Sequence, residues 1–238
     1  MRREPIFNVP ASVLAALGLL ASVHALLALL PEREAVRATL ALAFIPARYT
    51  EVGADLPGGL PAAATSFLSY ALVHADLTHL LVNAAWLLAF GSAVAMRIGG
   101  WRFVLFSAVC AGCGALTFLV LEWGAAVPVV GASGAVSGLM AAAFRFLFAV
   151  TDERGAEALR YSPRSVPLMS VPAMLTNRRV LTVIVVWIVL NFVMAAVAPA
   201  VMSTGGIAWQ VHLGGFAAGL LGFGFFDPVQ RTIEEPIN

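Results

Sequence analysis

A serine flanked by small residues opens a long apolar run in the second half of the chain. Gly131, Ala132, Ser133 and Gly134 follow Pro128, and the apolar run continues to about position 150. A serine hydroxyl becomes a good nucleophile only when a neighbouring base takes its proton. The free backbone N–H groups at the start of a helix favour negative charge, such as a developing oxyanion. The pattern therefore indicates nucleophilic catalysis by Ser133.

The base for such a reaction must come from elsewhere in the chain. The sequence has four histidines, and His74, His79 and His212 lie on or beside other apolar segments. His212 is the candidate base. His79 and Asn83 are four residues apart, so they share one helix face and could donate hydrogen bonds to an oxyanion. No Asp or Glu lies within an apolar segment near this layer, so the prediction is a Ser–His dyad.

Counting along the helices gives these groups a common depth. Ser133, Asn83 and His212 each precede a charged residue (Arg145, Arg97 and Asp227) by 12 to 15 positions, which is about 18 to 22 Å of α-helix. Those charges should mark the inner rim of a membrane, because charge is costly deeper in the bilayer. The three polar residues are then expected in one layer, about 10 Å below the outer surface of a core about 30 Å thick.

The amino-acid composition indicates a membrane protein. The chain of 238 residues is 61% hydrophobic and 11% charged, with a mean hydropathy of +0.91, whereas a soluble domain carries about 25% charged residues. The net charge of +1 gives no electrostatic case for nucleic acid. Cys110 and Cys113 lie in an apolar run without a second ligand pair, so we interpret them as packing residues. We expect no metal and no cofactor.

The apolar segments predict an all-α, polytopic membrane protein. Six segments approach the length of about 20 residues that a span requires: 11–30, 77–96, 102–121, 132–150, 180–199 and 207–226. We expect one membrane domain over 11–228, with tails at 1–10 and 229–238. Arginines concentrate in both tails, in the turn after the second span and in the 151–179 connection, which predicts that both termini are cytoplasmic.

The 31–76 connection is too polar to span a membrane and too apolar for a free loop. It is interrupted by prolines and glycines and contains spaced arginines. We predict an interfacial segment in the headgroup region. An ordinary periplasmic loop remains the alternative.

Small residues predict which spans touch. Gly134 and Gly138 are spaced four apart on the fourth span, and Gly215 and Gly219 repeat that spacing on the last. This pattern lets helix backbones approach closely. Contact between these spans would bring the serine and the histidine that they carry within hydrogen-bond reach.

These residues resemble the motifs of the rhomboid family of intramembrane serine proteases. Gly131-Ala132-Ser133-Gly134 resembles the G-x-S-G nucleophile motif, and His79-x-x-x-Asn83, preceded by His74, resembles the motif of the second span. The segment from His212 to Gly219 resembles the last span. The similarity covers about residues 65–228. It implies a six-helix bundle in a bacterial plasma membrane that cleaves single-span membrane proteins near the outer end of their helix, without a cofactor.

The resemblance also implies roles and shows two departures. Ser133 would be the nucleophile and His212 the general base, with the Ser133 N–H, His79 and Asn83 around the oxyanion. Ser137 stands where many bacterial members carry a tyrosine that stacks on the base. Thr65 and Ser66 stand where many carry Trp-Arg in the first long loop.

Two further residues and two other function classes stay open. Trp187 and Asn191 on the fifth span, the lateral gate of the family, are candidates to face the substrate, and interhelical packing is an equal alternative. The chain could instead be a non-catalytic rhomboid-like protein that binds membrane helices. A small transporter with His212 as a proton relay is a more distant third possibility.

Overall fold

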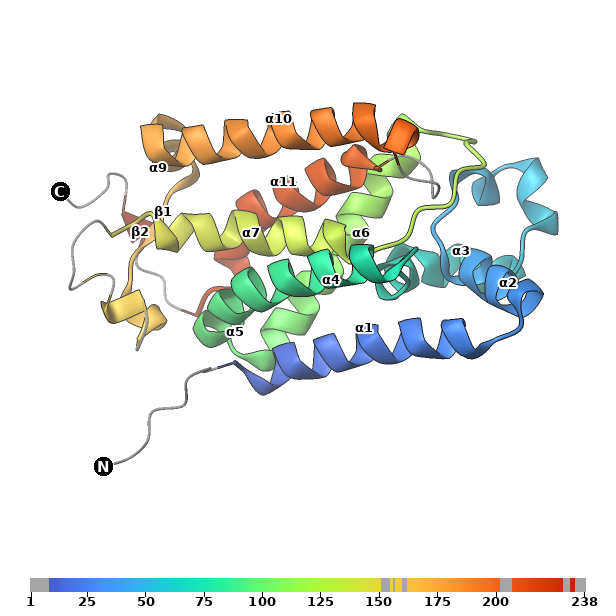
Figure 1. Ribbon diagram of the computed structural model, residues 1–238. Coiled ribbons are helices and arrows are strands. Elements are labelled where there is room, and N and C mark those ends of the chain that lie inside the picture. Colours follow the sequence, from blue (N-terminus) through green and yellow to red (C-terminus); the bar gives the residue numbers. More distant parts are fainter. Residues whose placement is uncertain are drawn as a thin grey trace.

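A computed structural model of the chain describes residues 9–150, 155, 157–159, 162–201, 207–228 and 232–233. Regular structure in these ranges is almost entirely helical (Figure 1), so the all-α prediction is confirmed. Two strands of two residues each, β1 (Leu168–Met169) and β2 (Thr232–Ile233), pair in parallel. The predicted tails fall largely outside the described residues.

Six helical segments match the six predicted spans. They are α1 (Ala11–Leu29), the continuous run of α4 (Leu77–Trp86), the π-helical η4 (Leu87–Gly91) and α5 (Ser92–Ile98), then α6 (Gly100–Leu121), α7 (Ser133–Leu147), α10 (Arg178–Val201) and α11 (Trp209–Phe226). In Figure 1, α1, α6 and α10 run in one direction, and α4–α5, α7 and α11 run in the other.

Length and composition identify the protein as membrane-embedded. Within the described residues, four helical segments are long and apolar enough to cross a bilayer: Ala11–Leu29, Leu77–Ile98, Gly100–Leu121 and Arg178–Val197. α7 is a shorter apolar helix of 15 residues. The chain is thus a polytopic helical membrane protein, and the count of six spans stays a prediction.

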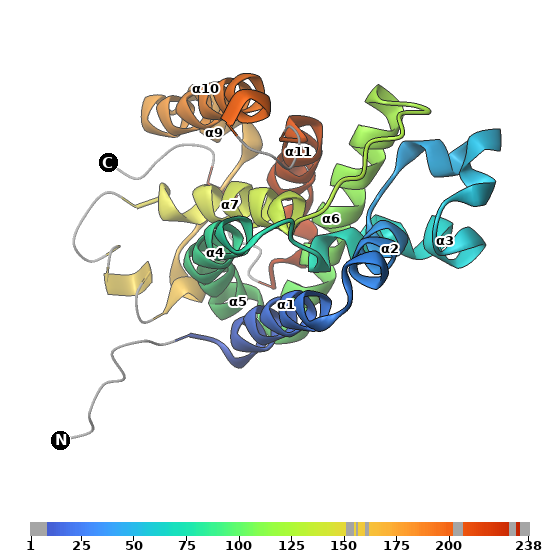
Figure 2. The same ribbon diagram turned by 45° about the vertical axis from the view of Figure 1, so that its right-hand side comes forward.

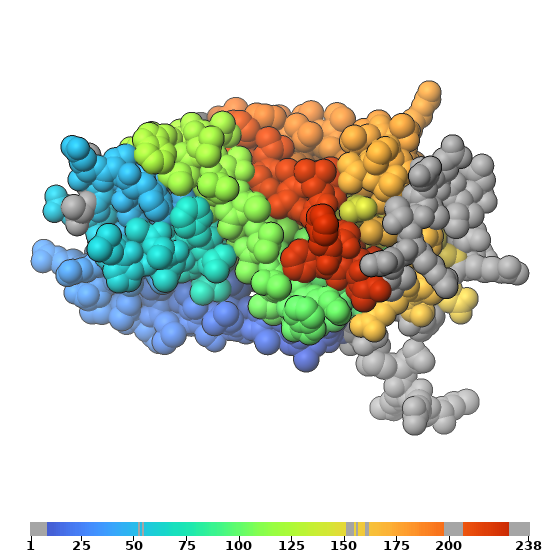
Figure 3. All heavy atoms as spheres, turned by 180° about the vertical axis from the view of Figure 1, so that it is seen from behind, coloured from blue at the N-terminus to red at the C-terminus, as the bar shows by residue number. Residues whose placement is uncertain are grey.

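The centre of the bundle is α7, as Figures 1 and 2 show. Every residue from Gly134 to Phe146 is buried, as expected for a helix that is apolar all round. α4–α5, α6 and α11 surround it. α10 lies further out beside α11, and most of its side chains are exposed toward the surroundings. The rear view places α11 at the surface between α6 and α10 (Figure 3).

Glycines let α7 and α11 pack backbone against backbone. A Cβ at Gly215 would overlap the carbonyl oxygen of Gly134, and a Cβ at Gly219 would overlap that of Gly138. The close approach predicted from the small-residue pattern is confirmed. Gly138 also faces the Cys110 sulfur, which a side chain at position 138 would overlap.

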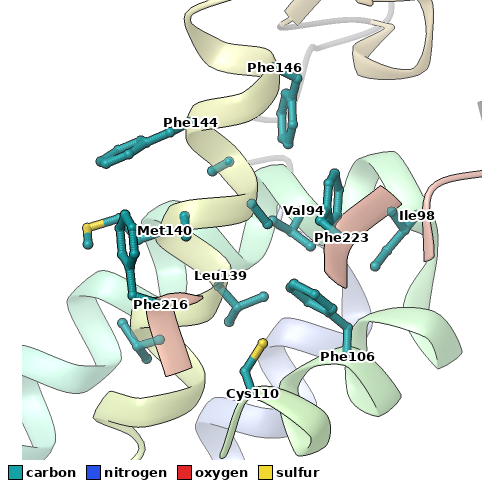
Figure 4. Packing of buried hydrophobic residues seen from close by; sticks show 14 of the residues in the cluster. Val94, Ile98, Phe106, Cys110, Leu139, Met140, Phe144, Phe146, Phe216 and Phe223 are labelled. Carbon is teal, nitrogen blue, oxygen red and sulfur yellow. The ribbon is translucent and has the colours of Figure 1, made fainter. Parts of the chain in front are cut away.

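Large apolar side chains pack around α7 next to its contact with α11 (Figure 4). Leu139 of α7 lies among Phe106 and Cys110 of α6 and Phe223 of α11. The rings of Phe106 and Phe223 meet edge to face, with centroids 5.4 Å apart. Both cysteines are free, and Cys110 packs as predicted. Because lipid is itself apolar, such packing stabilises the bundle through van der Waals contact.

Buried charges join the helices at the end remote from Ser133. The Arg97 guanidinium bonds Asp227 through Nε at 3.0 Å and Nη2 at 2.7 Å. Its Nη1 donates to the carbonyls of Pro163 and Val166, both at 2.8 Å. Arg145 donates through Nε to the carbonyl of Met169 at 3.0 Å. These bonds tie α5, α7 and α11 to η5 (Pro163–Ser165) and β1, which precede α9 (Val171–Thr176).

The 31–76 connection folds into short helices at the opposite end. They are α2 (Glu32–Leu42), η1 (Pro46–Tyr49), η2 (Glu51–Asp55), α3 (Gly59–Ser69) and η3 (Tyr70–Leu72). Arg48 holds them together, because it donates to the carbonyls of Pro57 at 2.8 Å and Leu40 at 2.7 Å. Thr65 and Ser66 occupy the Trp-Arg position. Thr65 bonds its own helix, whereas the hydroxyl of the buried Ser66 lies 3.5 Å from the hydroxyl of Tyr49 in η1. The interfacial location of the segment stays a prediction.

Because α7 and α11 are in backbone contact, replacing a contact glycine of α11 by alanine should lower the stability of the protein, whereas the same change elsewhere on α11 should not. Gly219→Ala should lower the melting temperature in detergent, because overpacking typically costs about 1–3 kcal/mol. Gly222→Ala is the matched control, since nothing lies within 4 Å of a Cβ there and Ala favours helix by about 1 kcal/mol over Gly. Equal melting temperatures for the two variants would contradict the packing described.

Candidate active site

Ser133 is the first residue of α7. Backbone groups of the 31–76 connection hold the segment before it through hydrogen bonds. Val129 pairs with Phe44 through two backbone hydrogen bonds of 2.8 and 3.0 Å. The Gly131 N–H then donates to the carbonyl of Tyr70 at 2.9 Å. These bonds satisfy an irregular backbone inside the protein, which is the condition for irregular structure at membrane depth.

Gly131 is required by its conformation and by its neighbour. Its φ is +121°, a region that residues with a side chain rarely adopt. A Cβ there would lie 2.7 Å from the His79 ring and 3.8 Å from Ser133 Oγ. The imidazole of His79 and the hydroxyl of Ser133 therefore flank the same point of the backbone.

The hydroxyl of Ser133 bonds the ring of His212. The distance from Ser133 Oγ to His212 Nε2 is 2.8 Å, although the residues are 79 positions apart. Both side chains are partly exposed. The glycine contact between α7 and α11 makes this distance possible. A hydroxyl bonded to an imidazole nitrogen is the arrangement in which the ring can take the hydroxyl proton.

The second nitrogen of His212 also has a partner. His212 Nδ1 lies 2.5 Å from Oδ1 of Asn191 on α10. The Asn191 amide nitrogen donates to the Trp187 carbonyl at 2.8 Å. The sequence predicts a dyad and a substrate-facing Asn191, whereas in the structure the Asn191 side chain contacts the candidate base. The interhelical alternative holds for Trp187 too, because its ring stacks on Phe216 with centroids 4.6 Å apart.

A signal for Asn191 was present in the sequence. It follows Arg179 by 12 positions, the separation between Ser133 and Arg145. The same count of about 18 Å places its depth in the layer of the serine. Tyr70 and Arg48, which position the outer segment, carry no comparable signal.

The second-span motif lies beside the nucleophile. Asp76 caps α4 by accepting from the His79 N–H at 2.8 Å. Asn83 is buried and donates through its amide to the His79 carbonyl at 3.0 Å. This bond uses one of two amide hydrogens. His79 itself is partly exposed, and its ring faces the backbone of Gly131, close to Ser133.

His74 supports the loop before the serine. Its ring lies edge to face against the His79 ring, with centroids 5.1 Å apart. Burial, together with the nearby His79, lowers the pKa of His74 to about 4, so the ring is neutral at neutral pH. Its Nε2 can then accept from the Ala132 N–H, at 3.4 Å.

Ser137 is buried one turn after Ser133, and within the described ranges no aromatic ring packs on His212. Among the same residues, no group of three or more His, Cys, Asp or Glu could hold a metal ion.

Comparison with known proteins identifies the family. The model of the Rhomboid domain matches residues 61–227, which is most of the chain and includes every residue of the candidate site. A search of curated proteins gave no match. The extent of the domain match shows that the chain belongs to the rhomboid family, whose members are in general intramembrane serine proteases.

Proposed function

We propose that this rhomboid protein is an active intramembrane serine endopeptidase, with Ser133 as nucleophile and His212 as general base. The observation that carries the proposal is the 2.8 Å contact between Ser133 Oγ and His212 Nε2. A non-catalytic relative that only binds membrane helices would have no need of this contact.

The reaction follows from these two groups. Ser133 Oγ attacks the carbonyl carbon of the scissile peptide bond while His212 Nε2 takes the hydroxyl proton. The protonated ring then gives this proton to the leaving amine nitrogen, which departs and leaves an acyl ester on Ser133. Water, deprotonated by the same Nε2, hydrolyses the ester and restores the hydroxyl. No metal or cofactor enters these steps.

Donors beside the serine would stabilise the oxyanion. The first N–H groups of a helix have no intrahelical partner, so the Ser133 N–H is available at the start of α7. The ring of His79 and the second amide hydrogen of Asn83 are the further donors in this proposal. A single donor of this kind contributes about 10²–10³ in rate.

The proposed substrate is a single-span membrane protein that enters sideways from the bilayer. Its helix must unwind at the scissile bond, since helical carbonyls are otherwise hydrogen-bonded, so small or helix-breaking residues are favoured there. In the family, entry is assigned to the fifth span. For this chain that would require the stack of Trp187 on Phe216 to separate.

We also propose a location in a bacterial plasma membrane, with both termini in the cytoplasm and the site open to the periplasm. The support is the arginine distribution. Arg97, Arg145 and Arg164 gather at the end remote from Ser133, and arginine-rich ends face the cytoplasm.

Removal of the nucleophile is the first test. Ser133→Ala should lower cleavage of a tagged single-span substrate about 10⁶-fold, because no other hydroxyl bonds the base in the described structure. Ser137→Ala, on the same helix, is the matched control and should cleave like the wild type. Gel analysis of reconstituted protein measures both, and persistent cleavage by Ser133→Ala would end the proposal.

An activated serine should also react with a fluorophosphonate probe. Wild-type protein is expected to be labelled at Ser133, and His212→Ala should lose the labelling because no base then takes the proton. Intact-mass spectrometry reads the adduct directly. A wild-type chain without an adduct would favour the alternative of a membrane-helix-binding protein.

Acid should abolish cleavage, since a protonated imidazole cannot accept the Ser133 proton. The initial rate, measured from about pH 8 to about pH 3, is expected to fall at the acid end of this range while circular dichroism shows an intact fold. A constant rate over that range would contradict the role of His212 as base.

A further inference from the structure

Three hydrogen bonds run in series from α10 to the nucleophile. The Trp187 carbonyl accepts from the Asn191 amide nitrogen, Asn191 Oδ1 faces His212 Nδ1, and His212 Nε2 faces Ser133 Oγ. The middle bond joins two helices that the glycine contact between α7 and α11 does not connect. It is also the bond that sets the state of the ring.

The first bond fixes which way the amide points. A backbone carbonyl only accepts hydrogen bonds, so the group that faces the Trp187 carbonyl at 2.8 Å must be the NH₂ of Asn191. The acceptor, Oδ1, therefore faces the ring. An oxygen that only accepts requires a proton on His212 Nδ1.

A proton on Nδ1 leaves the lone pair of the neutral ring on Nε2. This is the nitrogen that lies 2.8 Å from Ser133 Oγ. With the other tautomer, Nε2 would carry a hydrogen and could not take the serine proton, and Nδ1 and Oδ1 would face each other as two acceptors. The amide thus favours the one neutral form of the ring that can act as a base.

The neighbouring contacts hold the amide in register with the ring. Trp187 stacks on Phe216 one turn before Asn191, and Phe192 packs against Trp209 with centroids 4.9 Å apart. Both aromatic pairs join α10 to α11, which lie side by side in Figures 1 and 3. The polar contact of Asn191 with His212 lies between these two aromatic pairs.

We propose that Asn191 is a positioning residue that orients the His212 ring and holds its proton on Nδ1, so that the site works as a Ser–His–Asn series. This inference rests on the proposed function for its catalytic consequence. An amide does so without a charge, which matters because a carboxylate within a membrane span is costly.

The variants separate this role from helix packing. Asn191→Leu keeps the size of the side chain and removes the acceptor. We expect kcat on a tagged single-span substrate to fall about 10- to 100-fold, as when a metal-ligating histidine loses its orienting partner, with KM little changed. Asn191→Asp keeps an acceptor for Nδ1 and should retain more of kcat than Asn191→Leu. Phe192→Leu, on the adjacent residue, is the control for loosened packing and should lose less of kcat than Asn191→Leu.

The tautomer has a readout that needs no substrate. The chain contains only four histidines, so selective ¹⁵N labelling in detergent gives a resolvable set, and His212→Gln assigns the signal of interest. Wild-type His212 should carry its proton on Nδ1, and Asn191→Leu should shift the ring toward the other tautomer.

The outcomes that would overturn the role of Asn191 differ from those that would overturn the proposed function. A wild-type ring protonated on Nε2, a wild-type kcat in Asn191→Leu, or an equal loss in Phe192→Leu would overturn the role of Asn191. Failure of the proposed function looks different, because the wild-type chain would then neither cleave nor take up a fluorophosphonate. The NMR measurement on the wild type would still decide the proton position.

Discussion

The backbones of α7 and α11 touch, and the remaining geometry depends on this contact. A Cβ at Gly215 or Gly219 would overlap carbonyl groups of α7, so any larger residue must push the helices apart. Ser133 and His212 lie on these same two helices, and their 2.8 Å bond weakens steeply once the separation exceeds hydrogen-bond distance. The close packing that glycine allows between α7 and α11 thus sets the distance between the Ser133 hydroxyl and the His212 imidazole.

The depth of the site follows from the length of the central helix. α7 has 15 residues, which is about 22 Å, less than a membrane core of about 30 Å. If Arg145, which bonds the Met169 carbonyl, marks one rim as predicted from the sequence, the first residue of α7 falls short of the other rim. The chain before Ser133 must enter the bundle as irregular backbone, and the carbonyls of Phe44 and Tyr70 accept its N–H groups there. The buried Arg48 steadies this outer segment from its far side.

The buried ion pair of Arg97 and Asp227 lies at the end of the bundle remote from Ser133. The buried charges of Arg97 and Asp227 pair with each other at one end, where removal of either partner would leave an uncompensated charge. The groups proposed to react, to bind the oxyanion or to orient the base, on Ser133, His212, His79, Asn83 and Asn191, are a hydroxyl, imidazoles and amides. Neutral groups suit an apolar surrounding. The direction of each hydrogen bond between them depends on which atom carries the hydrogen. That is why the orientation of the Asn191 amide has consequences for the ring beside it.

Sequence alone determined the helical segments, the family motifs, the contact between the glycine faces and the common depth of Ser133 and His212. Each of these depends on local composition or on counting along one helix, and both can be read from a linear pattern. The structure decided the partner of His212 Nδ1 and the anchor of the outer segment. α10 is apolar on all sides, so its periodicity does not fix its rotation, and only packing against Phe216 and Trp209 turns Asn191 toward the ring. Likewise Arg48 finds the carbonyls of Leu40 and Pro57 only when short helices fold back on one another, because backbone carbonyls carry no sequence signature.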